Sequence, residues 1–487
     1  MSKAISSFEI SLHPRPKETT LANWLYGELR AAILDGRLKA GARLPASRDF
    51  ARLHRLSRGT VVSAFERLQD EGYLSSRVGV GTWVKFEAKS SQTSHTGAPH
   101  LPEYVRRAIG SHPKPKPFVE WVHFKGVRPF GMSYPALSEF PADLWGRITS
   151  RRVRCLRAWL HEEDDILGYR PLREAIAHYL GTSRGVRCSA EQVVIVSGVQ
   201  QALDLLSRLL LRPGDPVWME DPGYFGASIA FERAGAAIVP VPVDEHGLSV
   251  SGAIRACANA RGAYVTPAHQ YPLGMTLSLE RRVELLRWAA RTGAFVIEDD
   301  YDSEFRFKGH PSPALQGLDR HSSVIFVGTF TKLLFPSLRL GYAVLPPSLI
   351  DPFLSMRRGT ELRSSHLDQA VLYDFIVEGH FGRHLRRMRE LYAHRLETLI
   401  EASRRHLSGL LEVSETRAGL YTAAFLKNKL TSKDAERRAA ASGIETRSLD
   451  RFTLKCPDPR GLLLGFAAFD EKAIQRGVVK LAQALDG

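Results

Sequence analysis

The sequence contains few cysteines, and none of them forms part of a recognisable motif. Four occur in 487 residues, far apart along the chain, at Cys155, Cys188, Cys257 and Cys456. They form no CxxC pair and no Cys/His ligand spacing, which argues against a disulfide framework and against a zinc site. Four dispersed thiols are typical of a protein in a reducing cytoplasm.

Long hydrophobic runs are also missing. The N-terminus, MSKAISSFEISLHPRPKETT, holds no apolar signal-peptide region, and no stretch reaches the roughly 20 residues of a membrane-spanning helix. We therefore expect a cytoplasmic protein without a membrane partner.

Negative charge is in short supply. The chain carries 52 acidic residues against 67 Lys and Arg, a formal net charge of +15. Such an excess favours a polyanionic partner, with nucleic acid ahead of a membrane surface.

Residues 1–84 show the pattern of a small DNA-binding domain. Two apolar stripes at helical spacing, Leu21 to Ile33 and Val61 to Leu68, predict a first and a third helix, and Ser47 and Ser57 are candidate N-caps for the second and third. The alternating YLSSRVGVGTWV then predicts a β-hairpin. Helix, helix-turn-helix and hairpin together describe a winged helix-turn-helix.

A recognition helix presents its N-terminal side chains to DNA bases, and flanking elements contact phosphates. For each candidate arginine a solvated surface charge is an equally open interpretation. The candidate DNA-binding residues are Arg43, Arg48, Ser57, Arg58, Thr60, Ser63, Arg77 and Gly79.

The remainder divides into a linker and a large domain. Residues 85–118 are polar and proline-rich, which is typical of a linker. Residues 119–487 alternate short apolar strands with helical patterns, which predicts an α/β domain with a mostly parallel central sheet. Ligands of such sheets bind where the strands end.

Lys332, in GTFTKLLFPSLRLGY, follows one of these apolar strands. It is either an ordinary surface lysine at a strand end or an amine with a chemical role. In AFVIEDDYDSEF, Asp299 and Tyr301 are two residues apart, so their side chains point to one face, whereas Asp300 points to the other. A strand-end cap is the alternative role for Asp299.

An anion site is predicted nearby. Gly198, Val199 and Gln200 lie where a strand passes into a helix, and backbone amides there could hold a phosphate. Arg339 and Thr329, close to Lys332 in sequence, could add contacts. An amine, a carboxylate, a phenol and an anion site are what pyridoxal 5'-phosphate requires, with Lys332 as the Schiff-base lysine.

The same segments resemble known families. GARLPASRDFARLHRLSRGTVVSAFERLQDEGYL with GVGTWV is similar to the GntR-type winged helix, and SGVQQALDLL, EDPGYFG, HQYPLG, IEDDYDSEF and GTFTKLLFPSLRLGY resemble class I aminotransferases of fold type I. The resemblance implies that Asp299 contacts the pyridine nitrogen, Tyr301 the ring oxygen, and Arg339 and Thr329 the phosphate. It also implies that Tyr224 stacks on the ring, although packing at the DPGY turn is the alternative.

The fusion of the two resembles the MocR/GabR regulators. That resemblance implies a transcriptional regulator that binds a double-stranded DNA operator, senses a small amine or pyridoxal 5'-phosphate itself, and forms a head-to-tail homodimer. The alternative is a catalytically active aminotransferase with an autoregulatory DNA-binding extension. A regulator that has lost the cofactor is disfavoured, because Lys332, Asp299, Tyr301 and Arg339 are all present.

The chain departs from the aminotransferase pattern at three places. His269, Gln270 and Tyr271 precede Pro272 where an asparagine is usual, and HEEDDILGYRPLREAI lacks the upstream tyrosine of many relatives, which leaves a phosphate contact from the partner subunit open. GLLLGFAAFD has Leu462, Leu463 and Leu464 where the arginine that grips a substrate carboxylate is expected. Arg447, Arg451 or Arg460 could substitute, or be solvated charges. We therefore expect aldimine exchange without productive turnover.

Overall fold

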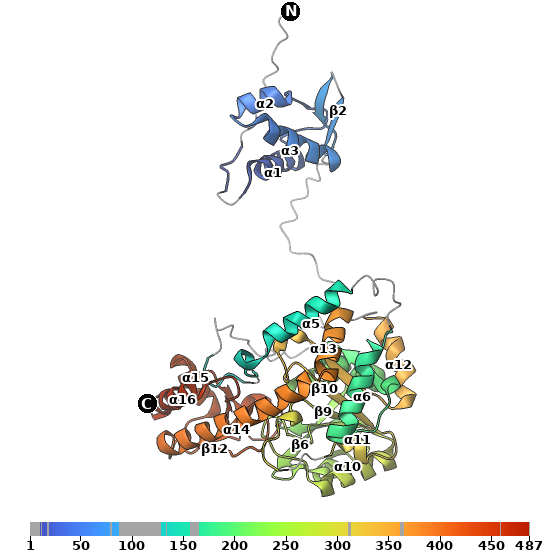
Figure 1. Cartoon of the computed structure of the whole chain (residues 1–487), viewed down its shortest axis with the longest axis vertical. Helices are drawn as coiled ribbons and strands as arrows, with labels where there is room; N and C mark the ends of the chain where they lie inside the picture. Colours follow the sequence, from blue (N-terminus) through green and yellow to red (C-terminus); the bar gives the residue numbers. More distant parts are fainter. Residues whose placement is uncertain are drawn as a thin grey trace, which may run out of the picture. The chain divides into compact units, whose positions relative to one another are not determined.

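The computed structural model describes residues 10, 12–16, 19–77, 80–86, 128–132, 134–155, 165–309, 313–360, 365–457 and 459–486. The chain divides into two compact units, Met1–Lys114 and Pro115–Gly487 (Figure 1). The division falls inside the segment interpreted as a linker, of which residues 87–118 lie outside the described residues. No helix in the described part of the chain is long and apolar enough to cross a membrane.

The first unit is a winged helix-turn-helix. Its elements are α1 (Leu21–Leu34), β1 (Arg43–Leu44), α2 (Ser47–Leu53), α3 (Arg58–Asp70), β2 (Leu74–Arg77) and β3 (Gly81–Val84). The apolar stripes pack on one another, with Leu25, Leu29, Phe50, Val61 and Leu68 in a common core. Two details differ from the sequence prediction. A third strand, β1, pairs with β3 to extend the hairpin, and Ala46 rather than Ser47 is the N-cap of α2.

The second unit is built on an eight-stranded sheet in the order β4-β11-β10-β9-β8-β5-β6-β7. The strands are β4 (Val193–Val196), β5 (Pro216–Asp221), β6 (Ala237–Asp244), β7 (Gly247–Leu248), β8 (Gly262–Val265), β9 (Phe295–Asp300), β10 (Val324–Thr329) and β11 (Gly341–Val344). Neighbours from β10 to β6 are parallel, whereas β11 and β7 are antiparallel to their neighbours. The predicted mostly parallel sheet is confirmed.

The central strands β9 and β10 are buried throughout, because helices cover both faces of this sheet. Alternate strand residues divide between the two sides. Val194 and Val196 pack with Phe231 and Phe353, and Val193 and Ile195 pack in another cluster. The surrounding helices are α6 (Arg170–Arg184), α7 (Val199–Leu210), α8 (Phe225–Arg233), α9 (Val250–Cys257), α10 (Leu279–Thr292), α11 (Leu315–Leu318) and α12 (Pro347–Arg358).

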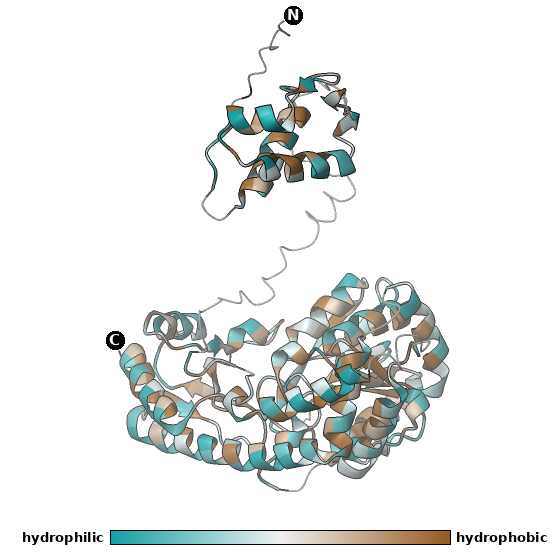
Figure 2. Ribbon diagram, turned by 45° about the horizontal axis from the view of Figure 1, so that its top comes forward, coloured by the Kyte–Doolittle hydropathy of each residue, from teal (hydrophilic) through white to brown (hydrophobic). Residues whose placement is uncertain are grey.

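A smaller antiparallel sheet follows, in the order β12-β13-β15-β14. Its strands are β12 (Leu411–Val413), β13 (Tyr421–Leu426), β14 (Arg447–Ser448) and β15 (Gly461–Gly465). The remaining α-helices are α5 (Ala142–Arg154), α13 (His366–Val377), α14 (His380–His406), α15 (Ser432–Ala441) and α16 (Glu471–Asp486), and short 3-10 turns include η5 (Pro336–Leu338) and η6 (Leu449–Phe452). The helices of both units alternate hydrophilic and hydrophobic stretches, as helices with one buried face do (Figure 2).

Candidate functional site

Asp299 lies near the end of β9 and is almost completely buried. The Tyr264 hydroxyl donates a hydrogen bond of 2.6 Å to Asp299 Oδ2, while Oδ1 has no partner among the described residues. Burial raises the pKa of the Asp299 carboxyl to about 7, and the Tyr264 hydrogen bond opposes that increase. A buried carboxylate oxygen without a donor is free to accept a hydrogen bond from the N–H group of a ligand.

Asp300 points to the opposite side of the sheet, as the alternation along β9 predicts. Its Oδ2 accepts a hydrogen bond of 2.8 Å from Nε of Arg184, and both side chains are buried. This ion pair leaves Asp299 as the carboxylate that faces the predicted site.

Lys332 follows β10 on a turn and is half-buried, next to the buried Leu333 and Leu334. Loss of hydration lowers the pKa of its amine to about 8, against the opposing attraction of Asp302. The structure therefore places Lys332 in an environment that favours the neutral amine far more than an exposed strand end would.

The residues of the predicted anion site come together. Gly198 has φ +127°, and a Cβ atom added to it would lie 3.9 Å from Nη2 of Arg339. The guanidinium thus adjoins the start of α7, whose first residues are Val199 and Gln200. Both the helix terminus and the exposed Arg339 attract an anion.

Thr329 pairs with Gly341, which approaches Gly198 closely. Its hydroxyl is engaged within the turn, where it accepts from the Thr331 amide at 3.1 Å and donates to the Leu340 carbonyl at 3.4 Å. The Thr331 hydroxyl is buried without a partner among the described residues. Thr331 is a candidate that the sequence analysis missed, although its position next to Lys332 in TFTK was a usable signal.

Tyr224 lies beside the anion site. Its hydroxyl donates to Oε1 of Gln200 at 3.2 Å, and Nε2 of Gln200 donates to the Gly226 carbonyl at 2.9 Å. The Gln200 side chain therefore positions Tyr224. Only the backbone amide of Gln200 remains to bind an anion. Burial raises the pKa of the Tyr224 phenol, with a further increase from Asp299 and a decrease from Arg339. The charges of Asp299 and Arg339 therefore both act on the Tyr224 phenol.

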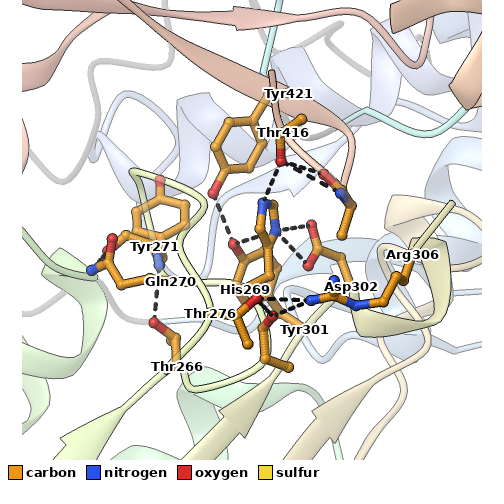
Figure 3. Close-up of polar contacts among 12 residues, drawn as sticks. Thr266, His269, Gln270, Tyr271, Thr276, Tyr301, Asp302, Arg306, Thr416 and Tyr421 are labelled. Atoms are coloured by element: carbon orange, nitrogen blue, oxygen red, sulfur yellow. Dashed lines mark hydrogen bonds and ion pairs between the residues drawn. The ribbon is translucent and has the colours of Figure 1, made fainter. Parts of the chain in front are cut away.

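Tyr301 belongs to a buried network drawn from three parts of the chain (Figure 3). Its hydroxyl lies 2.8 Å from that of Tyr421 on β13 and 3.1 Å from Nδ1 of His269, which is 2.9 Å from Oδ1 of Asp302. Nε2 of His269 lies 3.4 Å from the Thr416 hydroxyl. Tyr421, Asp302 and Thr416 were not identified from the sequence.

Tyr271, one of the three residues that precede Pro272, contributes a ring to the wall of the candidate site. It packs edge to face with Tyr224, Tyr301 and Tyr421 at centroid distances of 5.6, 5.8 and 6.0 Å. The side-chain amide of Gln270 is engaged by backbone groups, since its Nε2 donates to the Pro222 carbonyl at 2.9 Å and to the Tyr271 carbonyl at 2.6 Å.

β15 carries no arginine of the kind that binds a substrate carboxylate in aminotransferases. Its residues Leu462, Leu463 and Leu464 are all fully buried. Of the three substitutes considered, Arg451 donates to Glu436 and Arg460 to the Asn428 carbonyl. Arg447 lies on β14, opposite Leu463.

In the winged helix, the start of α3 is exposed. Ser57 caps the helix by accepting from the Thr60 amide at 3.1 Å, and the two hydroxyls lie 2.8 Å apart. Arg43 donates to the Val80 carbonyl in the wing. Exposed candidates are Arg43, Arg48, Ser57, Arg58, Ser63 and Arg77, and Thr60 is half-buried. Gly79 lies outside the described residues, as do residues 161–164 of the segment that lacks the upstream tyrosine.

The groups around Asp299 and Lys332 fit pyridoxal 5'-phosphate. The orphaned Oδ1 of Asp299 suits a protonated pyridine nitrogen, the Lys332 amine suits the aldehyde, and Arg339 with the start of α7 suits the phosphate.

Comparison with family models assigns each unit. Residues 21–84 match "Bacterial regulatory proteins, gntR family", and residues 160–480 match "Aminotransferase class I and II".

Relatives include full-length regulators. The chain is 40% identical to the probable rhizopine catabolism regulatory protein MocR of Rhizobium meliloti, over 96% of this chain and 94% of the relative. It is 28% identical to the pyridoxine biosynthesis transcriptional regulator PdxR of Corynebacterium glutamicum, over 99% of each.

Among solved structures, the α-aminoadipate aminotransferase LysN of Thermus thermophilus, complexed with N-(5'-phosphopyridoxyl)-L-leucine, matches with a TM-score of 0.68 and 29% identity. The match covers 74% of this chain and 93% of that one. The kynurenine aminotransferase of Pyrococcus horikoshii matches with a TM-score of 0.69 and 25% identity, over 80% and 95%.

Proposed function

The chain belongs to the MocR type of GntR-family transcriptional regulators, and we propose that its aminotransferase-like unit binds pyridoxal 5'-phosphate at Lys332 and reports an amine ligand, or the cofactor itself, to its DNA-binding unit. The observation that carries this proposal is the buried Asp299, whose Oδ1 has no donor among the described residues.

Each neighbouring residue has a role toward the cofactor. Asp299 would hold the pyridine nitrogen in its protonated form, and Lys332 would supply the amine. With a pKa of about 8, roughly a tenth of the Lys332 amine is neutral at pH 7, against well under a thousandth of an ordinary lysine. Bound pyridoxal phosphate supplies an aldehyde that bonds reversibly to primary amines, which is the chemistry an amine sensor needs.

The other walls of the site orient the ring. Tyr301, held by Tyr421 and His269, would donate to the ring oxygen, and Tyr224 would cover one face of the ring. Arg339, Thr329 and the amides at Val199 and Gln200 would hold the phosphate, with Thr331 as an additional donor.

The DNA-binding unit would read its operator through α3. Arg58, Thr60 and Ser63 would face base edges in the major groove, and the flanking Arg43, Arg48 and Arg77 would contact phosphates. A head-to-tail homodimer would present two such helices to a double-stranded operator with two half-sites.

The enzyme alternative has support in the complete set of cofactor-binding candidates, which an active aminotransferase needs as well. The sequence of β15 favours the interpretation as a regulator, because its buried leucines cannot bind the carboxylate of an α-amino acid. We propose amine exchange without productive turnover.

Borohydride reduction of the purified full-length protein tests the cofactor assignment. Reduction should fix the cofactor to the peptide that contains Lys332, and Lys332→Ala should abolish the attachment. Recovery of the label on another peptide would refute the assignment.

A further inference from the structure

The His269 imidazole and the Asp302 carboxyl form a buried pair in contact with Tyr301 (Figure 3). The two side chains are 2% and 1% exposed. Nδ1 of His269 lies 2.9 Å from Oδ1 and 3.1 Å from Oδ2 of Asp302, and 3.1 Å from the Tyr301 hydroxyl. One imidazole nitrogen therefore has three oxygen neighbours, and it can carry only one hydrogen atom.

Two glycines leave room for the imidazole and for nothing larger. A Cβ atom added to Gly419, whose φ is +93°, would lie 2.3 Å from Cε1 of His269 and 2.8 Å from Oδ2 of Asp302. A Cβ atom added to Gly274 would lie 3.2 Å from Nε2 of His269. Close packing on both sides fixes the position of the ring, so that Nδ1 stays at the carboxylate.

The carboxylate determines where the imidazole carries its hydrogen. As a carboxylate, Asp302 can only accept, so Nδ1 of His269 is the donor. A nitrogen that carries a hydrogen has no lone pair for a second one. Nδ1 therefore cannot accept from the Tyr301 hydroxyl, and the Tyr301 hydrogen must be directed elsewhere.

The Tyr421 hydroxyl determines where that hydrogen goes. Its oxygen lies 2.8 Å from that of Tyr301, and only Tyr301 hydrogen-bonds it among the described residues. If Tyr301 were the donor, the hydrogen of the buried Tyr421 hydroxyl would have no acceptor in the described part of the chain. With Tyr421 as the donor, Tyr421 is satisfied and the Tyr301 hydrogen is available to a ligand.

We propose that His269 and Asp302 are positioning residues that keep the Tyr301 hydroxyl a hydrogen-bond donor to the ring oxygen of the cofactor, and that Tyr421 is the donor to Tyr301. This inference rests on the proposed binding of pyridoxal phosphate at Lys332. It adds the residues that fix the direction of the hydrogen bond to the ring.

The direction of this hydrogen bond has a measurable consequence. A donor to the ring oxygen stabilises the anionic form of that oxygen, and so weakens its hold on the proton that it shares with the imine nitrogen at Lys332. Loss of the donor should therefore raise the pH at which this proton dissociates. The other titratable or charged groups that act on the network or on Lys332 are Asp302, Glu220, Tyr271, Glu304 and Arg306.

Spectrophotometric pH titration of the full-length, cofactor-loaded protein tests the proposal, because the cofactor absorbance reports the proton on the imine nitrogen. Tyr301→Phe should raise the pH midpoint by about one pH unit or more, which is a tenfold change in proton affinity. His269→Leu should also raise it, because the Asp302 carboxylate then competes for the Tyr301 hydrogen. His269→Asn, whose amide can still donate to Asp302, should restore part of the wild-type value.

Two further variants complete the titration. Tyr421→Phe should raise the midpoint less than Tyr301→Phe does, because a hydroxyl that accepts a hydrogen bond is a stronger donor. Tyr342→Phe changes a buried tyrosine outside the network and should leave the midpoint unchanged.

Four results would overturn the proposal. They are a wild-type midpoint in Tyr301→Phe, a wild-type midpoint in His269→Leu or Tyr421→Phe, equal midpoints in His269→Asn and His269→Leu, and an equal increase in Tyr342→Phe. If neither His269 variant folds, Tyr421→Phe decides alone. If the wild-type protein carries no cofactor on Lys332, the proposed function itself fails, and this is distinguishable from a loaded protein whose midpoint ignores these residues.

Discussion

The Tyr264 hydroxyl and Asp299 Oδ2 form a buried hydrogen bond of 2.6 Å, and the other carboxylate oxygen, Oδ1, has no partner among the described residues. The bond stabilises the ionised form of a carboxyl whose pKa burial raises to about 7. We therefore expect Tyr264 to affect cofactor binding through Asp299.

Tyr264→Phe should weaken binding of pyridoxal phosphate by about tenfold or more, because a hydrogen bond to a charged group contributes about 1.5–3 kcal/mol. Equilibrium dialysis of the apoprotein measures this affinity. Tyr342→Phe, which changes another buried tyrosine, is the matched control. Equal affinities for Tyr264→Phe and wild type would show that Asp299 needs no such support.

The rate of cofactor attachment should depend on pH through the neutral fraction of Lys332. That fraction rises as pH increases through the pKa of about 8, so the rate should increase about tenfold from pH 7 to pH 9 and then level off. Rapid mixing of apoprotein with cofactor, followed by absorbance, gives the profile. A rate that continues to rise tenfold per pH unit above pH 9 would indicate an ordinary, solvated lysine.

His269→Ala should destabilise the protein, because it removes the 2.9 Å partner of the buried Asp302 carboxyl. We expect a loss of about 1–3 kcal/mol in the free energy of unfolding, measured by urea denaturation. The double variant His269→Ala/Asp302→Ala should recover part of the loss. If the double variant is less stable than His269→Ala, the two side chains do not act as a pair.

Arg58→Ala should weaken operator binding by about 1–3 kcal/mol if the side chain contacts a base. Fluorescence anisotropy at fixed salt measures the affinity, and cofactor absorbance should not change. Arg52→Ala, which removes an equal charge from the exposed last turn of α2, is the control. Equal weakening by both variants would assign Arg58 to the general electrostatic attraction for DNA.

Local patterns in the sequence were sufficient for much of the architecture. Apolar stripes predicted α1 and α3. The two-residue spacing predicted that Asp299 and Tyr301 point to one face of the sheet and Asp300 to the other, where Asp300 pairs with Arg184. Ser57 was correctly identified as a cap. β1 was missed because its two residues carry no periodicity, and it is defined by its pairing with β3.

The side chains that support the candidate site could not be predicted in this way. Tyr264 and Tyr421 reach Asp299 and Tyr301 from strands 35 and 120 residues away in sequence, so only the assembled sheets bring them together.

Coupling between the two units is the central claim, and DNA affinity measured with and without ligand tests it most directly. Operator fragments should first be selected from random DNA by the full-length protein. Adding pyridoxal phosphate, or an effective amine to the loaded protein, should then change the operator affinity by about fivefold or more, as is typical of allosteric coupling. The change should be absent in Lys332→Ala, which should still bind the operator. An affinity that no ligand alters, or that changes equally in wild type and Lys332→Ala, would contradict the account.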